Sequence, residues 1–257
     1  MEWSDHGIVV GVRRHGETAV ILDVLTSRHG RHNGYVHGGR SRQLRACLQP
    51  GNGVDVVWRS RVEDQLGHFT VEPRRQRAAR VMASAEALHA VGHLCGLARL
   101  LAERETHPSL HDALDALLEE IDHPGLVPPG VARFELGLLT ELGFGLDLGR
   151  CAVTGRVDDL VYVSPRSARA VSRAAGEPYR DRLLPLPAFL RDAATSGEAP
   201  EVGDVLAAFR TLGHFLERSV FAPRGLTLPE PRAAYLAALA RRRAAQLARG
   251  QASDEVL

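Results

Sequence analysis

The 257-residue sequence contains no lysine, so all 32 of its cationic side chains are arginines. Aromatic residues make up only 5% of the chain. No apolar run approaches the roughly 18 residues of a membrane-spanning helix, and residues 1–5 lack the basic and apolar segments of a secretory signal peptide. We therefore expect a cytoplasmic protein that does not bind membranes and that contacts anions through guanidinium groups.

Only three cysteines are present, and their wide spacing in a chain without a signal peptide does not favour disulfides. Cys47 and Cys95 have apolar neighbours and are expected to be small core residues. Cys151 stands where a C-x-x-C knuckle would begin, but Thr154 occupies its second position, and Ser172 stands where a further cysteine would be expected. Because a tetrahedral zinc site needs four Cys or His ligands, we expect no zinc and no other cofactor, with Cys151 as the remnant of a knuckle.

The formal net charge is only +1, which argues against a protein that coats DNA through uniform positive charge. The total hides a segregation, because residues 1–80 hold 13 arginines and eight acidic residues, giving +5. Residues 81–150 hold four and 11, giving −7, and residues 151–257 hold 15 and 12, giving +3. A preference for arginine codons explains the missing lysine but not this pattern, which indicates an anionic partner at a local surface.

Residues 7–72 have the alternation and the turn signals of short β-strands. The predicted strands are 8–12, 18–26, 31–37, 54–58 and 67–71. Ser41 is the expected N-cap of a short helix at 41–48, which Pro50 and Gly51 end. Five strands with a helix between the third and fourth are typical of an OB-fold barrel, although SH3-like barrels also have five strands. We therefore predict an OB-fold domain at residues 1–78, a fold often used to bind single-stranded nucleic acid.

After Pro73 the pattern changes from alternating to helical. Residues 74–80, which hold four arginines, are expected to form a basic linker. Helices are predicted at 88–101, 109–121, 128–143, 165–175, 187–194, 204–220 and 230–248. The predicted fold class is therefore α+β, with a five-stranded barrel followed by a mainly α-helical domain at residues 79–257. A degenerate, metal-free hairpin similar to a zinc knuckle is expected at about residues 148–165 of that domain.

A series of short motifs runs along residues 7–236. In the first domain they are 7–12, 16–18, 25–30 and 48–50, and in the second they are 133–136, 142–144, 151–155, 162–165 and 184–187. With these motifs in this order, the sequence resembles the bacterial recombination mediator family RecO. The resemblance implies an N-terminal OB barrel, a helical C-terminal domain, and a knuckle that holds zinc in some members.

The resemblance also implies an activity that is not an enzyme's, with no catalytic residues. Proteins of this family bind single- and double-stranded DNA and anneal complementary strands. With the partner RecR they help to load the recombinase RecA onto strands coated by single-stranded DNA-binding protein, and they recognise the acidic C-terminal tail of that coating protein. We therefore expect a role in DNA repair and homologous recombination at the nucleoid.

DNA binding requires cations that meet phosphates and rings that stack on bases. Arginines of the barrel, of its small helix and of the linker are the candidates for the first, and Tyr35 is the candidate for the second. The predicted DNA-binding residues are Arg13, Arg14, Arg31, Tyr35, Arg40, Arg42, Arg45, Arg74, Arg75 and Arg77. The alternative is that Tyr35 belongs to the barrel wall and that several of these arginines are only solvated. Because aromatics are few, we expect binding to be mainly electrostatic.

A receptor for an acidic tail with apolar end residues needs an apolar groove with arginines at its edge. The predicted peptide-binding residues lie on the expected helix 204–220 and are Phe209, Arg210, Phe215 and Arg218. The alternative is that the two phenylalanines belong to the apolar stripe that a helical domain must bury.

Two rival functions stay open. His89 and His93 are four residues apart on one predicted helix, a spacing that suits a divalent metal and therefore a metal-dependent enzyme. However, no His-Glu-x-x-His frame surrounds them, and the sequence has no Gly-rich phosphate loop and no G-x-S-x-G elbow. The other rival is a scaffold whose barrel binds protein tails but not DNA.

Overall fold

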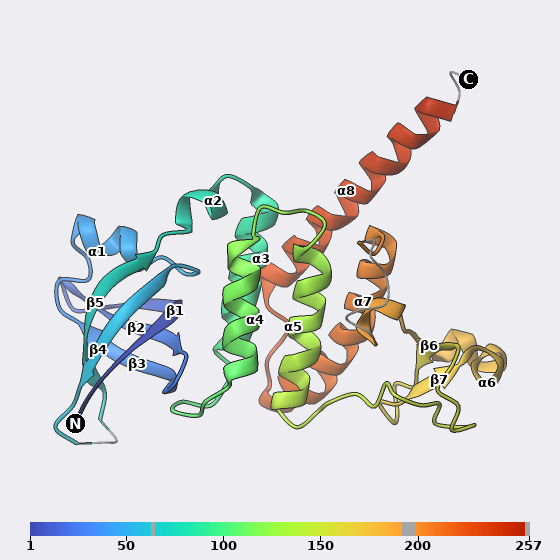
Figure 1. Cartoon of the computed structure of the whole chain (residues 1–257), viewed down its shortest axis with the longest axis horizontal. Helices are drawn as coiled ribbons and strands as arrows, with labels where there is room; N and C mark the ends of the chain where they lie inside the picture. Colours follow the sequence, from blue (N-terminus) through green and yellow to red (C-terminus); the bar gives the residue numbers. More distant parts are fainter. Residues whose placement is uncertain (63–64, 192–198, 255–257) are drawn as a thin grey trace. The chain divides into compact units, whose positions relative to one another are not determined.

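The alternating segments at the start of the chain build a closed five-stranded barrel (Figure 1). Its strands are β1 (Glu2–His15), β2 (Ala19–Thr26), β3 (Gly30–Val36), β4 (Gly53–Arg59) and β5 (Gly67–Arg75). They follow one another in the order β1-β2-β3-β5-β4, and β4 pairs with β1 to close the barrel. Helix α1 (Arg42–Cys47) lies between β3 and β4 in the chain. This topology confirms the predicted OB-fold barrel.

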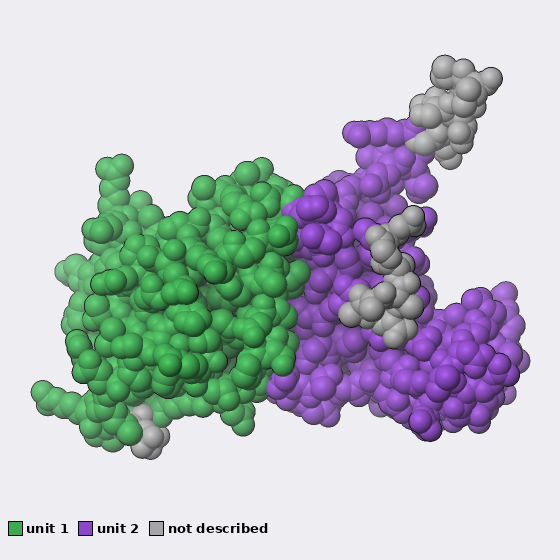
Figure 2. Space-filling view, in the orientation of Figure 1, with its two compact units in different colours: residues 1–122 green, residues 123–257 purple. Residues whose placement is uncertain are grey.

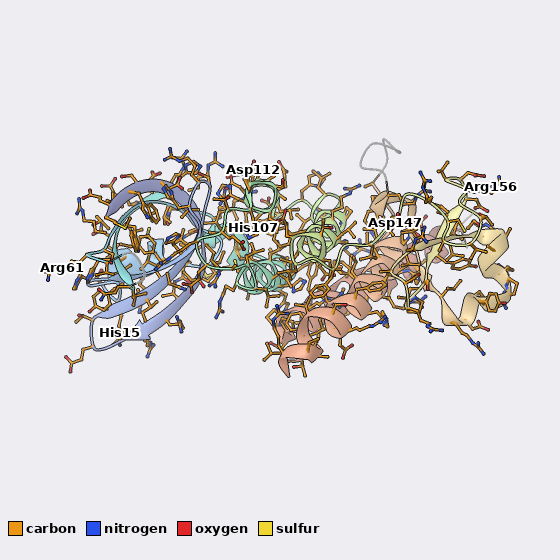
Figure 3. The ribbon with its side chains drawn as sticks, turned by 90° about the horizontal axis from the view of Figure 1, so that it is seen from below. His15, Arg61, His107, Asp112, Asp147 and Arg156 are labelled. Atoms are coloured by element: carbon orange, nitrogen blue, oxygen red, sulfur yellow. The ribbon has the colours of Figure 1, made fainter. Side chains whose placement is uncertain are left out.

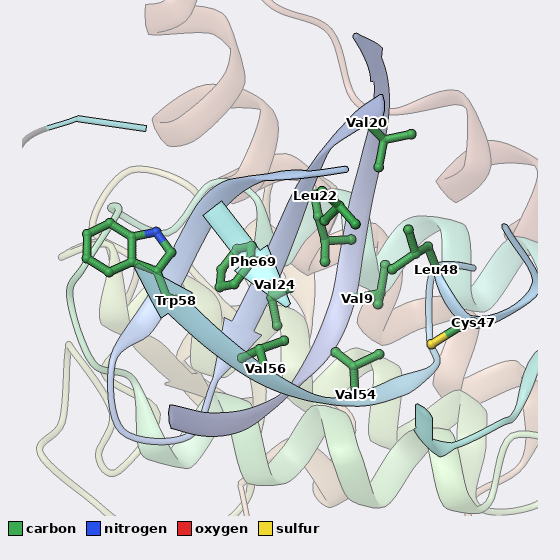
Figure 4. Packing of buried hydrophobic residues seen from close by; sticks show 11 residues of the cluster. Val9, Val20, Leu22, Val24, Cys47, Leu48, Val54, Val56, Trp58 and Phe69 are labelled. Atoms are coloured by element: carbon green, nitrogen blue, oxygen red, sulfur yellow. The ribbon is translucent and has the colours of Figure 1, made fainter. Parts of the chain in front are cut away.

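Apolar side chains from all five strands fill the barrel (Figure 4). Trp58 and Phe69 lie at one end of this core, and Leu48, directly after α1, lies at the other. Two glycines let the strands pass close to the rings: a Cβ on Gly34 would come within 2.3 Å of Phe69, and one on Gly67 within 2.3 Å of Trp58. The parallel pairing of β3 with β5 at these two glycines therefore depends on the absence of side chains there.

A buried asparagine ties α1 to the segments that follow the barrel. Asn52 is fully buried, and its amide nitrogen donates to the main-chain oxygens of Ala46 and Cys47, both at 3.0 Å. Its amide oxygen accepts from the main-chain N–H groups of Arg77 at 2.8 Å and Ala78 at 3.0 Å. One side chain therefore satisfies the last turn of α1 and the first turn of α2 (Ala78–Met82).

The prediction that residues 74–80 form a linker is wrong. Arg74 and Arg75 belong to β5, and the residues after Arg77 form α2. The Arg77 side chain is only 3% exposed, and it donates to Asp115 at 2.7 Å and to Glu119 on α4 (Pro108–Glu119). The hydrogen bond from Arg77 lowers the pKa of the Glu119 carboxyl, although some burial opposes the shift. The segment is thus a structural junction of barrel and helices.

Two longer helices complete this part of the chain. Helix α3 (Ala85–Ala98) has Ser84 as its N-cap, and α4 begins at Pro108, which suits the first turn of a helix. Both helices overlap those predicted at 88–101 and 109–121. Cys47 and Cys95 are buried, as predicted, and burial raises the pKa of the Cys95 thiol to about 12.

The second part of the chain is mainly helical, with one small sheet of order β7-β6-β8. Its elements are α5 (Val127–Glu141), β6 (Leu160–Val163), β7 (Ala170–Ser172), α6 (Arg173–Gly176), the 3₁₀ helix η1 (Glu177–Arg182), β8 (Leu184–Pro185), the 3₁₀ helix η2 (Ala188–Leu190), α7 (Val202–Phe215), the π-helix η3 (Leu216–Phe221), the 3₁₀ helix η4 (Ala222–Arg224) and α8 (Glu230–Asp254). The helices predicted at 128–143, 204–220 and 230–248 correspond to α5, to α7 with η3, and to α8.

A buried ion pair holds the three long helices of this part together. Arg232 on α8 donates to both carboxylate oxygens of Glu135 on α5, at 2.8 and 3.1 Å. It also donates to the main-chain oxygen of Phe209 on α7, at 2.7 Å. Both charged groups are buried, so each depends on the other to offset its lost hydration.

Two predicted helices of this part are wrong. In place of the helix at 165–175 there is a turn, in which Ala168 has a φ of 55°, followed by β7 paired with β6 and the single turn of α6. A positive φ at a non-glycine residue interrupts a helix. In place of the helix at 187–194 there is the 3₁₀ turn η2, and residues 192–194 lie outside the described residues.

The computed structural model describes residues 1–62, 65–191 and 199–254, with side chains up to residue 249. Its contacts group residues 1–122 and 123–257 as two compact units (Figure 2). Helices α2, α3 and α4 therefore belong to the same unit as the barrel, and the boundary predicted at residues 78 and 79 stays a prediction. Within the described ranges, no helix has both the length and the apolar character that a membrane crossing requires.

The Asn52 junction gives the first testable prediction. Asn52→Ala removes the side-chain partner of four main-chain groups, so we expect the free energy of unfolding to fall by about 3 kcal/mol. Urea denaturation measures this change. Gln43→Ala, at an exposed position of α1, is the matched control and is expected to change stability by less than about 0.5 kcal/mol. Equal stability of the two variants would contradict the role given to Asn52.

Candidate nucleic-acid interface

Ion pairs divide the predicted DNA-binding arginines into two groups. In the first group the guanidinium already has a carboxylate partner. Arg31 contacts Asp23 at 2.9 Å, and Arg74 contacts Asp55 at 3.0 Å. Arg75 lies 2.8 Å from Asp115, the residue that also pairs with the buried Arg77. The charge of these arginines is neutralised within the protein, and the buried Arg77 is not accessible to a phosphate.

The second group has no such partner. Among the described residues, no carboxylate forms an ion pair with Arg13, Arg14, Arg40, Arg42 or Arg45. All five side chains belong to exposed residues of β1, of α1 and of the connection between β3 and α1. Positive charge that the fold leaves uncompensated is therefore concentrated at the end of the barrel where these segments lie.

Three of these arginines line one pocket. Arg14, Arg40 and Arg45 surround a floor of apolar residues, and we call this site the arginine pocket. The apolar lining residues are Val12, Val20, Leu48 and Pro50. A concave apolar floor with guanidinium groups around it suits an anion that carries flat apolar parts, as a nucleotide does.

Local structure holds each guanidinium at the pocket. Arg14 lies on β1 in register with Val20 of β2. The main-chain N–H of Arg40 donates to the Thr18 oxygen at 3.0 Å, and its side chain donates to the main-chain oxygens of the β1–β2 turn. The Ser41 hydroxyl accepts from the Leu44 N–H, which confirms Ser41 as the N-cap of the helix that carries Arg45. A guanidinium fork placed in this way can bind two phosphate oxygens at once.

Arg42 and Arg13 extend the positive surface beyond the pocket. Arg42 and Arg45 are three residues apart on α1 and therefore lie on one face of it. Arg13 is in register with Ile21, on the opposite side of β1 from Arg14. Phosphates bound along this end of the barrel can thus continue from the pocket to the outer face of the strands.

Tyr35 lies on the outer face of β3 and is half-buried. It does not belong to the barrel core, which is formed by the opposite face of the strands. Its ring is surrounded by the imidazoles of His15, His37 and His68, with centroids 4.5–5.5 Å away. The predicted site includes Tyr35 but not these three histidines. His37 is two residues away from Tyr35, whereas His15 and His68 come from distant segments of the sequence.

Two hydroxyl residues, Thr154 and Ser172, lie beside Cys151 in the knuckle region. The Cys151 N–H donates to the Arg156 oxygen at 2.7 Å, and the Gly155 N–H donates to the Cys151 oxygen at 2.9 Å, so residues 151–156 form a tight turn. Arg156 is exposed on this turn (Figure 3). The Ser172 N–H and hydroxyl lie 3.3 and 3.5 Å from the Cys151 sulfur. Burial raises the pKa of Cys151, but the hydrogen bonds from Ser172 and Thr154 outweigh it and lower that pKa to about 6.

These residues do not fit a zinc ion. Ser172 stands where a further cysteine ligand would be expected, and it hydrogen-bonds the Cys151 sulfur instead. Three residues further on, at the spacing of a C-x-x-C pair, the residue is Ala175. In the part of the chain that the structure describes, no group of three or more His, Cys, Asp or Glu residues is arranged to hold a metal. That finding also covers His89 and His93, of which His93 is fully buried within α3.

The predicted peptide site does not form an open groove. Phe209 and Phe215 are buried, at 0% and 3% exposure, and Phe209 packs against Tyr235 in the core. Only Arg210 and Arg218 of the predicted set are exposed, and Arg218 donates to the main-chain oxygen of Pro165. The apolar stripe of α7 is therefore core, as the alternative interpretation had it.

A different groove in the same unit does combine apolar and cationic residues. It lies where the start of α5, the start of α7 and the middle of α8 meet. Its lining includes Pro128, Pro129, Val202, Val205, Arg242, Arg243 and Leu247. The Arg243 guanidinium lies over Gly203, where a Cβ would be 3.0 Å from it. We call this site the α8 groove. The pattern of arginines at 241–243 was visible in the sequence, but its apolar neighbours come from distant segments.

Comparison with known families gives the same result for both parts of the chain. Residues 1–77 match the family described as Recombination protein O N terminal. Residues 82–228 match the family described as Recombination protein O C terminal. The first match covers the barrel, and the second covers the helical part up to the start of α8.

Several curated relatives are similar over nearly their whole length, and each is named "DNA repair protein RecO". The protein of Methylocella silvestris is 55% identical over 242 residues, which cover 94% of this chain and 97% of that protein. The protein of Methylobacterium nodulans is 52% identical over 239 residues, covering 92% and 97%. The protein of Chelativorans sp. is 52% identical over 242 residues, covering 94% and 96%. With barrel, helical part and relatives all in agreement, the chain belongs to the RecO family.

Proposed function

We propose that this protein acts in DNA repair and homologous recombination by binding single- and double-stranded DNA and by annealing complementary strands. The observation that carries the proposal is the arginine pocket. Its three guanidinium groups have no carboxylate partner among the described residues, and the arginines lie on β1, on the connection between β3 and α1, and on the capped helix α1. Relatives that are more than half identical are named DNA repair proteins, which supports the same role.

The arginine pocket suits annealing because it contacts phosphates and not base edges. Contacts to phosphate carry no sequence information, so strands of any sequence are bound. Neutralising phosphates also reduces the repulsion between two strands, while their base edges stay available for pairing. No step of this process needs bond chemistry, and we infer that the protein is not an enzyme.

Salt dependence tests the assignment of the phosphate contacts. Each phosphate contact to a single strand adds about 0.7 to the slope of log affinity against log salt concentration. We therefore expect Arg14→Ala with Arg45→Ala to reduce this slope by about 1.4. Fluorescence anisotropy with a labelled oligonucleotide at several salt concentrations measures it.

Arg74→Ala with Arg75→Ala is the matched control for this experiment. It removes the same number of arginines from the barrel, but from residues that already have carboxylate partners. We expect its slope to stay within about 0.3 of the starting protein, since no phosphate contact is lost. If the slope changed more in the control than in the Arg14 and Arg45 variant, the phosphate contacts would not lie at the arginine pocket.

We also infer partners for this activity. The protein is expected to act with RecR and, indirectly, with the recombinase RecA on strands coated by single-stranded DNA-binding protein. It would do so in the cytoplasm, at the nucleoid. The α8 groove supports a contact with the acidic tail of the coating protein, since it has an apolar lining with Arg242 and Arg243 beside it.

Peptide binding distinguishes the α8 groove from the site predicted on α7. With a labelled acidic peptide that ends in apolar residues, Arg243→Glu is expected to weaken binding at least tenfold, because it reverses a charge beside the groove. Arg210→Glu, an equal charge change at an exposed position of α7, is expected to leave the affinity within twofold. The opposite ranking would support the site on α7.

We propose further that the knuckle is metal-free and is held by the Cys151–Ser172 hydrogen bonds. Elemental analysis of the purified protein is expected to find less than about 0.1 zinc per chain, because two of the expected ligand positions hold hydroxyl residues. A chelator is then expected to leave the melting temperature unchanged. Stoichiometric zinc, or a chelator-induced loss of stability, would contradict this prediction.

A further inference from the structure

The outer face of the barrel carries a group of rings that belong neither to the core nor to the arginine pocket. The group consists of His15 at the end of β1, Tyr35 on β3, His37 directly after β3, and His68 on β5. We call it the ring platform. The three histidines are exposed, and Tyr35 is half-buried between them. His15 projects from the barrel surface in Figure 3.

Strand register brings the platform together. Tyr35 is directly opposite His68 in the parallel pair of β3 and β5. His37 lies two residues after Tyr35 on the same side of the strand and stacks on His68, with ring centroids 5.2 Å apart and planes 5° from parallel. The Tyr35 ring meets His37 edge-on, at 4.5 Å and 75°, and also meets His15 edge-on, at 5.4 Å and 85°.

A row of charged residues continues the platform across the barrel. Tyr35 pairs with Ile21 of β2, and Ile21 pairs in turn with Arg13 of β1. Arg13 has no carboxylate partner among the described residues. On the other side His68 is opposite Arg59, which is paired with Glu2 at 2.9 Å. Uncompensated positive charge therefore borders the platform on the side of β1. Arg14 lies next to Arg13 on β1, with its side chain on the opposite face of the strand.

The chemistry of the platform favours unpaired bases over the other candidates. Flat imidazole and phenol rings that are open to solvent offer faces on which bases stack. Three neighbouring histidines also invite interpretation as a metal site, but in the described ranges they do not form a group that could hold a metal. Bases in a duplex are already stacked on one another, so only an unpaired strand presents faces to such a surface.

We propose that the ring platform stacks on bases of an unpaired strand whose phosphates are held at the arginine pocket. This rests on the proposed DNA-binding function and adds the selectivity for strand type. Arg40 follows His37 by three residues on one connection, and Arg14 precedes His15 at the end of β1, so the pocket and the platform lie on neighbouring segments, with Arg14 on the opposite face of β1 from His15. The pocket supplies affinity for any nucleic acid, and the platform supplies a preference for single strands.

Paired measurements on single and double strands test the platform. His37→Ala with His68→Ala is expected to weaken binding of a single-stranded oligonucleotide about tenfold, because the rings on which bases would stack are lost. Binding of a blunt duplex of the same length is expected to stay within twofold. An oligonucleotide containing 2-aminopurine reports stacking directly: its fluorescence is expected to fall on binding to the starting protein and to fall less with the variant.

Thr70→Ala is the matched control, since Thr70 is exposed on the same face of β5 as His68. It is expected to bind both kinds of DNA, and to quench 2-aminopurine, like the starting protein. Tyr35→Leu keeps apolar bulk in the barrel wall and provides a second variant if the histidine pair changes the fold.

The outcomes separate the two proposals. If the arginine variants weaken binding while the ring variants keep both the preference for single strands and the quenching, the platform is wrong and the proposed function stands. An equal loss for single strands and duplex in the ring variants would also overturn the platform, because stacking should affect only unpaired bases. If the starting protein binds no DNA at low salt, both proposals are overturned.

Discussion

The first unit depends on the buried amide of Asn52. A fully buried side chain with partners on both its nitrogen and its oxygen leaves only one arrangement of the segments around it. That arrangement fixes where α1 ends and where α2 begins. Because α1 carries Arg42 and Arg45, and because Arg45 lines the arginine pocket, a structural amide inside the protein determines where positive charge is presented outside it.

The distribution of charged residues along the chain is more informative than the net charge of each segment. The first 80 residues carry an excess of arginine, and the next segment carries an excess of acid. Part of this acid, on and after α4, is used inside the same unit to neutralise Arg75, Arg77 and Arg80. The barrel arginines that have no carboxylate partner among the described residues lie on β1, on α1 and in the connection between β3 and α1. The proposed interface therefore follows from which arginines lack an ion pair, and the number of arginines alone would not indicate it.

In the second unit a buried ion pair joins helices instead of neutralising surface arginines. The Glu135–Arg232 pair joins α5, α7 and α8 through one guanidinium, which also binds the Phe209 oxygen. Because Phe209 is held in this core, the proposed peptide groove is the one at the starts of α5 and α7 and the middle of α8, where arginines lie beside prolines and valines. In the proposed metal-free knuckle, hydrogen bonds from Ser172 to the Cys151 sulfur join residues that are 21 positions apart.

The barrel, its helix with the Ser41 cap, the long helices and the burial of Cys47 and Cys95 could all be predicted from the sequence. Those features depend on local periodicity and capping, which neighbouring residues specify. The strand at residues 170–172 was not predicted, although its cause is also local: the chain turns at Ala168, where φ is 55°, and pairs with β6. The burial of Arg77, the place of Phe209 in the core and the position of His15 and His68 beside Tyr35 depend on residues far away in the chain, and a single sequence does not reveal which distant side chains meet.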